Sequence, residues 1–291
     1  MTATLANPAG PPVLTASDFQ RISELARERF GLNLPSGKEG LVAARLGKKI
    51  REGSFASFAD YYRHVVSDST GNSLIELIDA LTTNHTFFLR ERAHFDFLRQ
   101  IVTREYQDRP GLRIWSAACS TGEEPYSIAM YLTDVAREIP CRWSSGVRIL
   151  ATDISTRVLT KAQRAVYATE RFREIPESWW KNYLLRGQKA CEGTYKVKPA
   201  IAGLVEFERL NLIEPLPRRS FEIIFCRNVL TYFNKATQKD IVARLSACLE
   251  PGGYLFVGHS EALTGIEHKL DYVRPAVYRN QNASGPRRRS A

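Results

Sequence analysis

The sequence predicts an α/β protein in which a doubly wound parallel sheet carries a small inserted β-subdomain and follows an all-helical domain. From residue 82 onward, short apolar runs alternate with amphipathic segments, a pattern typical of parallel strands covered by helices. Before that point, apolar residues recur at spacings of three and four without strand-like runs, which indicates helices alone. These two observations define the predicted fold class.

Composition is that of an ordinary globular protein, with 44% hydrophobic and 25% charged residues among 291. The N-terminus has neither a basic start nor an apolar core, and no apolar run is long enough to span a membrane. We therefore expect a soluble, cytoplasmic protein without membrane insertion. The five cysteines form no CxxC pair and no His pair stands at metal-ligand spacing, so we expect free thiols and no metal.

The formal net charge of +10 is unevenly spread along the chain. Residues 1–81 carry nine basic and nine acidic side chains, whereas residues 137–200 carry thirteen basic and six acidic ones. Such a surplus favours an acidic partner, which could be nucleic acid, anionic lipid or an acidic protein surface. Charge alone does not choose among the three.

The helical domain is expected over residues 17–81. Residues 1–16 are rich in Pro, Ala and Gly, and we expect them to be disordered. A first helix begins at Ser17 or Asp18, either of which can cap it, and stops at Gly31. Three further helices are predicted at Ser36–Glu52, Phe55–Val66 and Ser73–Leu81.

The sheet domain is expected over residues 82–280, with a disordered tail at 281–291. A helix at Glu91–Tyr106 leads into it. Strands are predicted at Leu112–Ala117, Val147–Thr152, Val205–Leu210, Phe221–Cys226 and Tyr254–Val257. Helices are predicted at Glu123–Arg137, Arg157–Ala165 and Lys235–Leu249.

Residues 166–204 are too many for a simple crossover between two strands. They contain a helical pattern at Ser178–Leu185, then a turn region with Gly187 and Gly193, then a strand-like run at Thr194–Lys198. We predict an inserted helix and a small β-hairpin.

Ligands of doubly wound sheets bind where the strands end. The first strand is followed by a turn of small residues, Ser116–Gly122, and then by Glu123 and Glu124. The turn lacks the GxGxxG pattern, so it is not specialised for pyrophosphate. By spacing alone, both acids are expected to cap the following helix.

The second strand ends in Asp153, where a carboxylate can accept hydrogen bonds from both hydroxyls of a ribose. The alternative is that Asp153 caps the next helix. A small-residue turn without phosphate glycines and a ribose-type Asp together favour a nucleoside ligand that lacks a diphosphate. S-adenosylmethionine fits that description.

Two further segments are rich in polar residues. The fourth strand ends FCRNVLTYF at 225–233, with Arg227 and Asn228 where DNA amino methyltransferases commonly carry a Pro-Pro element. Tyr232 follows and either reaches the reactive centre or packs in the core. In the segment 81–90, Asn84, Thr86 and Arg90 are candidates to face a ligand pocket.

These stretches resemble the chemotaxis-receptor glutamate O-methyltransferases, the CheR family. The resemblance implies a Rossmann-like S-adenosylmethionine methyltransferase domain with a small β-subdomain, preceded by a helical N-terminal domain. The matching segments occur in family order across most of residues 17–280: TTNHTFFLRE (82–91), WSAACSTGEEPYSIA (115–129), ATDIS (151–155), ERLNL (208–212), FCRNVLTYF (225–233) and LEPGGYLFVGHSE (249–261).

The resemblance also implies the reaction and the residues that serve it. The reaction is methyl transfer from S-adenosylmethionine to the γ-carboxylate of receptor glutamates, giving a methyl ester and S-adenosylhomocysteine. Arg90 and Tyr232 are placed beside the transferred methyl group, while Glu123 keeps its capping role. Cofactor contacts are implied for Asn84, Thr86, Arg90, Glu124, Asp153, Asn211, Leu212, Arg227 and Asn228.

Arg45, Lys48 and Lys49 share one face of the second predicted helix. By the residues alone this is a solvated face. The resemblance implies that it docks on the acidic cytoplasmic helices of chemoreceptors, at receptor arrays on the membrane. Some family members also bind a receptor C-terminal peptide at the β-subdomain, but Lys189 here replaces a glycine that those members often have, so tethering stays open.

Two alternatives are weighed against this interpretation. A nucleic-acid methyltransferase would use the positive charge, but the Pro-Pro element is missing and no aromatic residues are interleaved with the basic stripe. A non-catalytic cofactor-binding adaptor would retain receptor docking, but Arg90, Asp153 and Tyr232 are all present. We expect no nucleic-acid partner.

Overall fold

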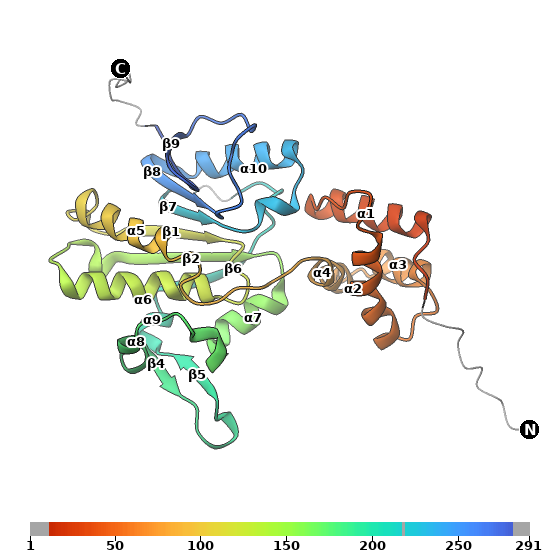
Figure 1. Cartoon of the computed structure of the whole chain (residues 1–291), viewed down its shortest axis with the longest axis horizontal. Coiled ribbons are helices and arrows are strands. Elements are labelled where there is room, and N and C mark those ends of the chain that lie inside the picture. Colours follow the sequence, from red (N-terminus) through yellow and green to blue (C-terminus); the bar gives the residue numbers. More distant parts are fainter. Residues whose placement is uncertain (1–11, 217–218, 282–291) are drawn as a thin grey trace, which may run out of the picture. The chain divides into compact units, whose positions relative to one another are not determined.

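The computed structural model describes residues 12–216 and 219–281 and contains two compact units. The helical unit comprises the described residues up to Asn84 together with Tyr232–Asn234, and the sheet unit comprises the remaining ones (Figure 1). The predicted disorder of the first eleven residues and of the tail from residue 282 lies outside the described residues. Among those described, every helix is too short or too polar to cross a membrane.

The helical unit contains four helices: α1 (Ala16–Phe30), α2 (Glu39–Glu52), α3 (Phe58–Ser67) and α4 (Asn72–Leu81). Their apolar stripes, which include Ile22, Val42, Leu46, Phe58 and Ile78, are buried together and form the core of the unit.

The starts of α1, α2 and α3 differ from the prediction. The cap of α1 is Thr15 rather than Ser17 or Asp18, because the Thr15 side chain accepts from the backbone N–H of Asp18 and the Asp18 carboxylate bonds back to residue 15. Helix α2 begins at Glu39 and not Ser36, because Gly37 has a left-handed φ of 92° and the chain turns there. Helix α3 begins at Phe58 and not Phe55, because Ser57 is its cap.

The sheet unit is built on a seven-stranded sheet of order β6-β2-β1-β7-β8-β10-β9. The first five strands in that order are parallel, which confirms the predicted fold class, while β10 pairs antiparallel with β8 and β9. The strands are β1 (Leu112–Ala117), β2 (Val147–Asp153), β6 (Val205–Arg209), β7 (Phe221–Cys226), β8 (Leu249–Val257), β9 (Asp271–Arg274) and β10 (Val277–Arg279).

Four helices accompany the large sheet: α5 (Ala93–Arg104), α6 (Glu123–Glu138), α7 (Thr156–Arg164) and α10 (Lys235–Ala247). The predicted helix 235–249 is two residues too long, because Leu249 already pairs with Phe221 as the start of β8. Strands β9 and β10 were not predicted. Their runs are only four and three residues long, respectively, and β9 is mostly exposed at the sheet edge, so no apolar period marks them.

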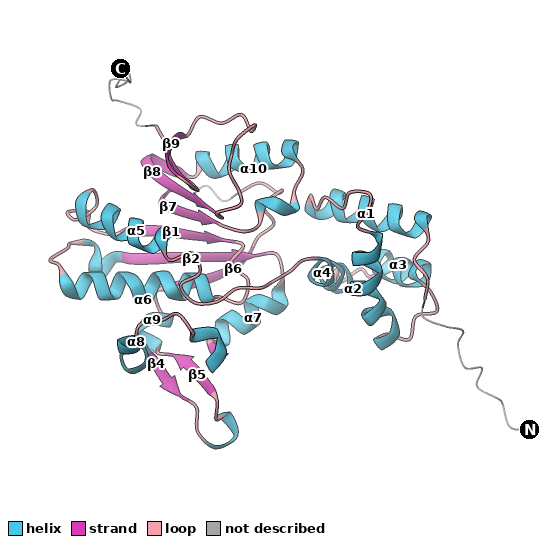
Figure 2. Ribbon diagram, viewed as in Figure 1, coloured by secondary structure: helices cyan, strands magenta, loops and turns pink. Residues whose placement is uncertain are grey.

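The inserted segment forms a second, three-stranded sheet of order β3-β5-β4 (Figure 2). Its strands are β3 (Val166–Ala168), β4 (Leu184–Arg186) and β5 (Thr194–Val197), and they are accompanied by α8 (Glu177–Tyr183) and α9 (Pro199–Ala202). The predicted hairpin exists as β4 and β5, but β3 adds a third strand. The predicted helix 178–185 ends early, because Leu184 pairs with Val197.

The order of the large sheet reverses between β1 and β7. From β1 the chain proceeds outward through β2 to β6, and it then returns to β7 and proceeds the other way to β8. Ligands of doubly wound sheets bind at the carboxyl edge at such a point. Ala117 and Cys226, the last residues of β1 and β7, lie side by side there.

Candidate cofactor site

The turn after β1 is unusually tight. Ala118, Ser120 and Gly122 all have positive φ, at 62°, 51° and 91°. A Cβ on Gly122 would lie 2.8 Å from the Cβ of Ala162 and 2.9 Å from the hydroxyl of Tyr167, so only glycine fits. The turn therefore brings backbone to the carboxyl edge of the sheet rather than large side chains.

Asp153 holds this turn against the end of β2. Its Oδ2 accepts from the backbone N–H of Ser120 at 2.8 Å, and its Oδ1 accepts from that of Ser155 at 3.0 Å. The cap of α7 is Ser155, whose side chain accepts from Val158. The alternative that Asp153 caps this helix is therefore wrong.

Glu123 and Glu124 begin α6, but no side chain caps it, because the cap residue is Gly122. Both acids stand in the first turn, where negative charge is favourable at a helix N-terminus, but neither is the cap residue itself. Glu124 accepts from the Ser116 hydroxyl at 2.7 Å and from Arg227 Nη1 at 2.9 Å. Glu123 is 1% exposed and accepts from the Thr121 hydroxyl at 2.6 Å, and burial raises the pKa of its carboxyl.

Arg227 follows β7 and is the centre of a buried polar network. Its Nη2 donates to Glu91 Oε2 at 2.9 Å and to the carbonyl oxygen of Arg90 at 2.6 Å, while Nη1 holds Glu124. Asn228 has a left-handed φ of 59°, and its side-chain amide donates to Glu91 Oε1 at 3.2 Å. The network thus joins the ends of β1 and β7 to the segment before α5.

Glu91 is a member of this network that sequence reasoning did not assign. It stands in the quoted stretch TTNHTFFLRE directly after Arg90, and that position was the only signal. The fold determines which arginine pairs with a given acid. Arg227 lies 136 residues after Glu91 in the sequence, so spacing could not predict this pair.

The other predicted residues of the sheet unit lie around the same edge. Arg90 Nη1 donates to the carbonyl of His85 at 3.0 Å, and Thr86 is 8% exposed, with its carbonyl accepting from Arg171 at 2.6 Å. Asn211 and Leu212 follow β6, which lies next to β2, and Leu210 donates to the carbonyl of Asp153 at 3.0 Å.

Asn84 and Tyr232 belong to the helical unit. The Tyr232 hydroxyl donates to the carbonyl of Thr83 at 3.0 Å and accepts from its N–H at 3.1 Å. The Tyr232 carbonyl accepts from the N–H of Asn33 at 2.8 Å. The hydroxyl and the backbone carbonyl of Tyr232 are therefore both hydrogen-bonded within this unit. The hydroxyl bonds to Thr83, the residue that precedes Asn84 in the sequence.

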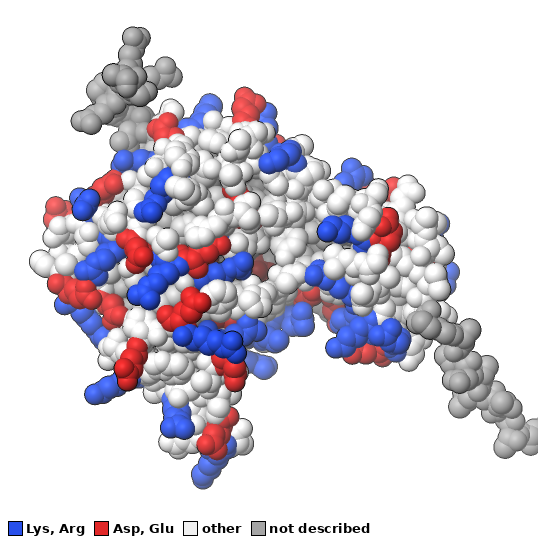
Figure 3. Space-filling model, viewed as in Figure 1, with Lys and Arg blue, Asp and Glu red and all other residues white. Residues whose placement is uncertain are grey.

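The predicted basic stripe is partly neutralised inside the helical unit. Arg45 donates to the carbonyl of Leu81 and to the hydroxyl of Thr83, and Lys49 pairs with Glu76 at 2.8 Å. Lys48 is 74% exposed and lies 3.8 Å from Glu52. In Figure 3, basic side chains of this unit likewise have acidic ones beside them.

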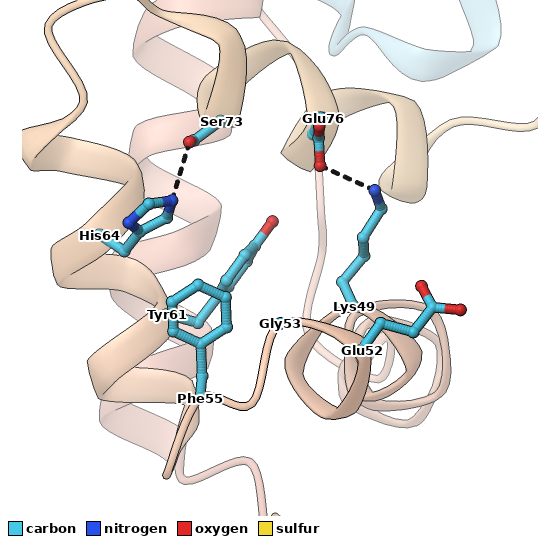
Figure 4. Close-up of a pocket in the computed structure, with 8 residues that line it drawn as sticks. All are labelled: Lys49, Glu52, Gly53, Phe55, Tyr61, His64, Ser73 and Glu76. Carbon is cyan, nitrogen blue, oxygen red and sulfur yellow. Dashed lines mark hydrogen bonds and ion pairs between the residues drawn. The ribbon is translucent and has the colours of Figure 1, made fainter.

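Lys49 and Glu76, which pair at 2.8 Å, form one side of a pocket of about 220 Å³ (Figure 4). Its other lining side chains come from α2, α3, α4 and the α2–α3 turn: Glu52, Phe55, Tyr61, His64 and Ser73. Tyr61 is 4% exposed, and its hydroxyl has no hydrogen-bond partner within residues 12–216 and 219–281. Burial, followed by the charge of Glu76, raises the pKa of Tyr61 to about 12.

Glu91, His94 and His259 are close enough to share an ion, with candidate ligand atoms within 4.8 Å of one another. However, Arg227 Nη2 already lies 2.9 Å from Glu91 Oε2. A divalent ion bound to that oxygen would be repelled strongly by the guanidinium at such a separation. The cation that this carboxylate binds in the structure is therefore Arg227.

These side chains suit a sulfonium nucleoside. Carboxylates at the ends of β1 and β2 match ribose hydroxyls and positive charge, whereas a diphosphate would be repelled. Arg227 Nε is buried and has no partner among the described residues, so it can donate to a ligand. A doubly wound sheet with this set of groups at its reversal point is that of an S-adenosylmethionine-dependent methyltransferase.

Comparison with known families agrees with this class. Residues 17–82 match the all-alpha domain of CheR methyltransferases, and residues 84–278 match their SAM binding domain. The chain therefore belongs to the CheR methyltransferase family, and its cofactor is S-adenosylmethionine.

Similar proteins span nearly the whole chain. "Chemotaxis protein methyltransferase 2" of Pseudomonas aeruginosa is 40% identical over 266 residues, which cover 91% of this chain and 93% of that protein. "Chemotaxis protein methyltransferase" of Escherichia coli K12 is 37% identical over 270 residues, covering 91% of each. The protein of the same name from Borreliella burgdorferi is 37% identical over 275 residues, covering 91% and 95%.

Proposed function

We propose that this protein methylates glutamate γ-carboxylates on the cytoplasmic part of chemoreceptors, giving glutamyl methyl esters and S-adenosylhomocysteine. It acts in the cytoplasm at receptor arrays. Similarity to chemotaxis methyltransferases along both domains supports the substrate class. The observation that carries the cofactor part of the proposal is the buried Glu124–Arg227–Glu91 network at the carboxyl edge of the sheet, in which both ion pairs measure 2.9 Å.

A site of this kind positions reactants and needs no general base. A glutamate has a reference pKa near 4.3, so at neutral pH its carboxylate is ionised and ready to attack. Bound S-adenosylmethionine supplies a methyl group activated by a sulfonium. The carboxylate oxygen–carbon bond forms as the sulfur–carbon bond breaks, and no proton moves. The protein aligns the atoms and limits water.

The proposed roles are those that the resemblance to the CheR family implies for these positions. Asp153 binds the ribose, and Glu124 and Arg227 bind the charged groups of the cofactor's amino-acid part. Arg90 orients a carboxylate, either that of the substrate or that of the cofactor. Tyr232 supplies a further hydrogen bond. Asn84, Thr86, Asn211, Leu212 and Asn228 complete the cofactor contacts.

Receptor docking is proposed for Arg45, Lys48 and Lys49 on α2. The acidic side of a receptor helix would attract this face. Arg45 and Lys49 also have partners inside the unit. We therefore expect substitution of the exposed Lys48 to affect receptor docking with the least effect on stability. A receptor C-terminal peptide could pair with an edge strand of the small sheet, where β4 exposes Leu185.

The decisive experiment is transfer of tritiated methyl groups to a purified receptor cytoplasmic fragment, followed by base treatment. We expect label in the fragment that base releases as volatile methanol, because esters hydrolyse under these conditions. Base-stable label would indicate amine methylation. Transfer to DNA or RNA instead would favour a nucleic-acid methyltransferase, and cofactor binding without transfer to any acceptor would favour an adaptor.

A further inference from the structure

Glu261 lies just after β8 and carries a buried carboxylate that the proposed reaction does not use. The residue is 5% exposed. It stands in the quoted stretch LEPGGYLFVGHSE, to which sequence reasoning assigned no role. A buried carboxylate is costly unless it is well hydrogen-bonded, so its partners indicate its purpose.

The partners of Glu261 are backbone N–H groups of two loops. Oε2 accepts from Asn228 at 2.6 Å and from Gly258 at 2.8 Å, while Oε1 accepts from Thr231 at 3.1 Å. One side chain therefore ties the loop after β7 to the loop after β8, at the carboxyl edge of the sheet. Three N–H donors satisfy most of what an ionised carboxylate requires.

The loop after β7 carries the residues proposed to bind the cofactor. Arg227 begins it, Asn228 follows, and Glu261 grips the chain at residues 228 and 231. Asn228 is in the left-handed region with φ 59°, a turn conformation that asparagine adopts more readily than most other non-glycine residues. The short bond from Glu261 to the Asn228 N–H fixes the backbone at that turn.

Gly258 permits the close approach of the two loops. A Cβ added there would lie 2.5 Å from the Asn228 side-chain nitrogen and 2.7 Å from Glu261 Oε2. Any larger residue would therefore push Asn228 or Glu261 away. The glycine and the carboxylate act on the same point of the β7 loop.

We propose that Glu261 is a positioning residue, which holds the loop from Arg227 to Thr231 in the conformation that binds S-adenosylmethionine without touching a reacting atom. The inference rests on the proposed cofactor site. It predicts that losing the carboxylate weakens cofactor binding beyond any general loss of stability.

Glu222 offers a matched control. It is also buried, at 4% exposed, and its Oε2 accepts from the backbone N–H of Arg113 at 2.7 Å. Glu222 lies near the start of β7, whereas Glu261 follows β8 and bonds to the loop after the end of β7. Removing either carboxylate should cost stability, but only Glu261 should affect the cofactor.

The experiment compares Glu261→Gln with Glu222→Gln in the full chain. A carboxamide must turn its NH₂ toward at least one of the N–H donors that Glu261 accepts. We expect the Kd for S-adenosylhomocysteine, measured by titration calorimetry, to rise about ten-fold in Glu261→Gln. Glu222→Gln should keep the wild-type Kd within about two-fold at a comparable drop in Tm.

Gly258→Ala is the second variant, because it disturbs the same contact while keeping the acid. It should raise the Kd in the same direction. An unchanged Kd in both Glu261→Gln and Gly258→Ala would overturn the inference, as would an equal rise in Glu222→Gln. If wild-type protein itself did not bind S-adenosylhomocysteine, the proposed cofactor site would fail instead, so the two failures are distinguishable.

Discussion

Arg227 and Glu124 form an ion pair at 2.9 Å although 103 residues separate them along the chain. The Arg227 side chain is 2% exposed and that of Glu124 is 14% exposed. The pair joins the end of β7 to the start of α6, the helix that follows the neighbouring strand β1. Charges held this far from water must remain paired, because a buried charge without its partner is strongly destabilising.

Replacing Glu124 by Gln should therefore lower stability and cofactor affinity together. We expect a loss of about 2–4 kcal/mol in the free energy of unfolding, since Arg227 would then keep Glu91 alone as a charged partner among the described residues. Urea denaturation measures this loss, and calorimetric titration with S-adenosylhomocysteine measures the affinity.

Glu138→Gln is the control for that change. Glu138 ends the same helix and pairs with Arg99 at 2.6 Å, but both side chains are about half exposed, at 56% and 41%. Exposed ion pairs contribute little to stability, so we expect the free energy of unfolding to change by about 0.5 kcal/mol or less. A similar loss in both variants would contradict the importance assigned to the buried pair.

Tyr232→Phe should lower turnover more than it lowers cofactor affinity. The substitution removes the hydroxyl that bonds to both the N–H and the carbonyl of Thr83, at a cost of about 1 kcal/mol in stability. The comparison needs kcat with a receptor fragment and the Kd of S-adenosylhomocysteine. An equal loss of turnover and of cofactor affinity would contradict the assignment of Tyr232 to the transfer step.

Charge reversal on α2 separates docking from folding. Lys48→Glu should raise the KM for a receptor fragment with little change in Tm, because Lys48 is 74% exposed. Arg45→Glu should in addition lower the free energy of unfolding by about 1–2 kcal/mol, since Arg45 donates hydrogen bonds to Leu81 and Thr83.

Reversing Arg45, Lys48 and Lys49 together should weaken receptor methylation most while the Kd of S-adenosylhomocysteine stays unchanged. The docking proposal would be wrong if the receptor KM did not respond to these reversals.

His94 predicts how stability depends on pH. Burial, and then the charge of Arg227, lower the pKa of His94 from 6.5 to about 3. The unfolded chain takes up a proton below pH 6.5 and the folded chain does not, so stability falls as pH falls. Between pH 6.5 and 5 the loss from this group is about 1.5 kcal/mol.

His94→Phe should remove that part of the acid sensitivity, because phenylalanine does not titrate and can keep the edge contact with Phe256. Urea titrations at pH 5, 6 and 7 of both proteins test this. If the stability of both proteins fell equally between pH 7 and pH 5, groups other than His94 would be responsible for the acid sensitivity.

The sequence by itself determined most of the elements and their order, although not β3, β9 and β10. Strands β1 and β7 have the predicted bounds, because a strand that is largely buried on both faces appears as a near-continuous apolar run. Motifs read in order also led to the family and its cofactor. Strand and helix periods and short motifs depend on residues within a few positions of one another, so a single sequence is enough to recognise them.

Only the tertiary structure decided how the polar residues pair. It turned Glu124 from an expected cap into a partner of Arg227, brought in Glu91 and Glu261, engaged Arg45 inside the helical unit, and added β3 to the predicted hairpin. Each of these depends on groups far apart in the chain, whose contact is determined by packing. Spacing carries no record of such partners, since one carboxylate can bond to any donor that the fold brings to it.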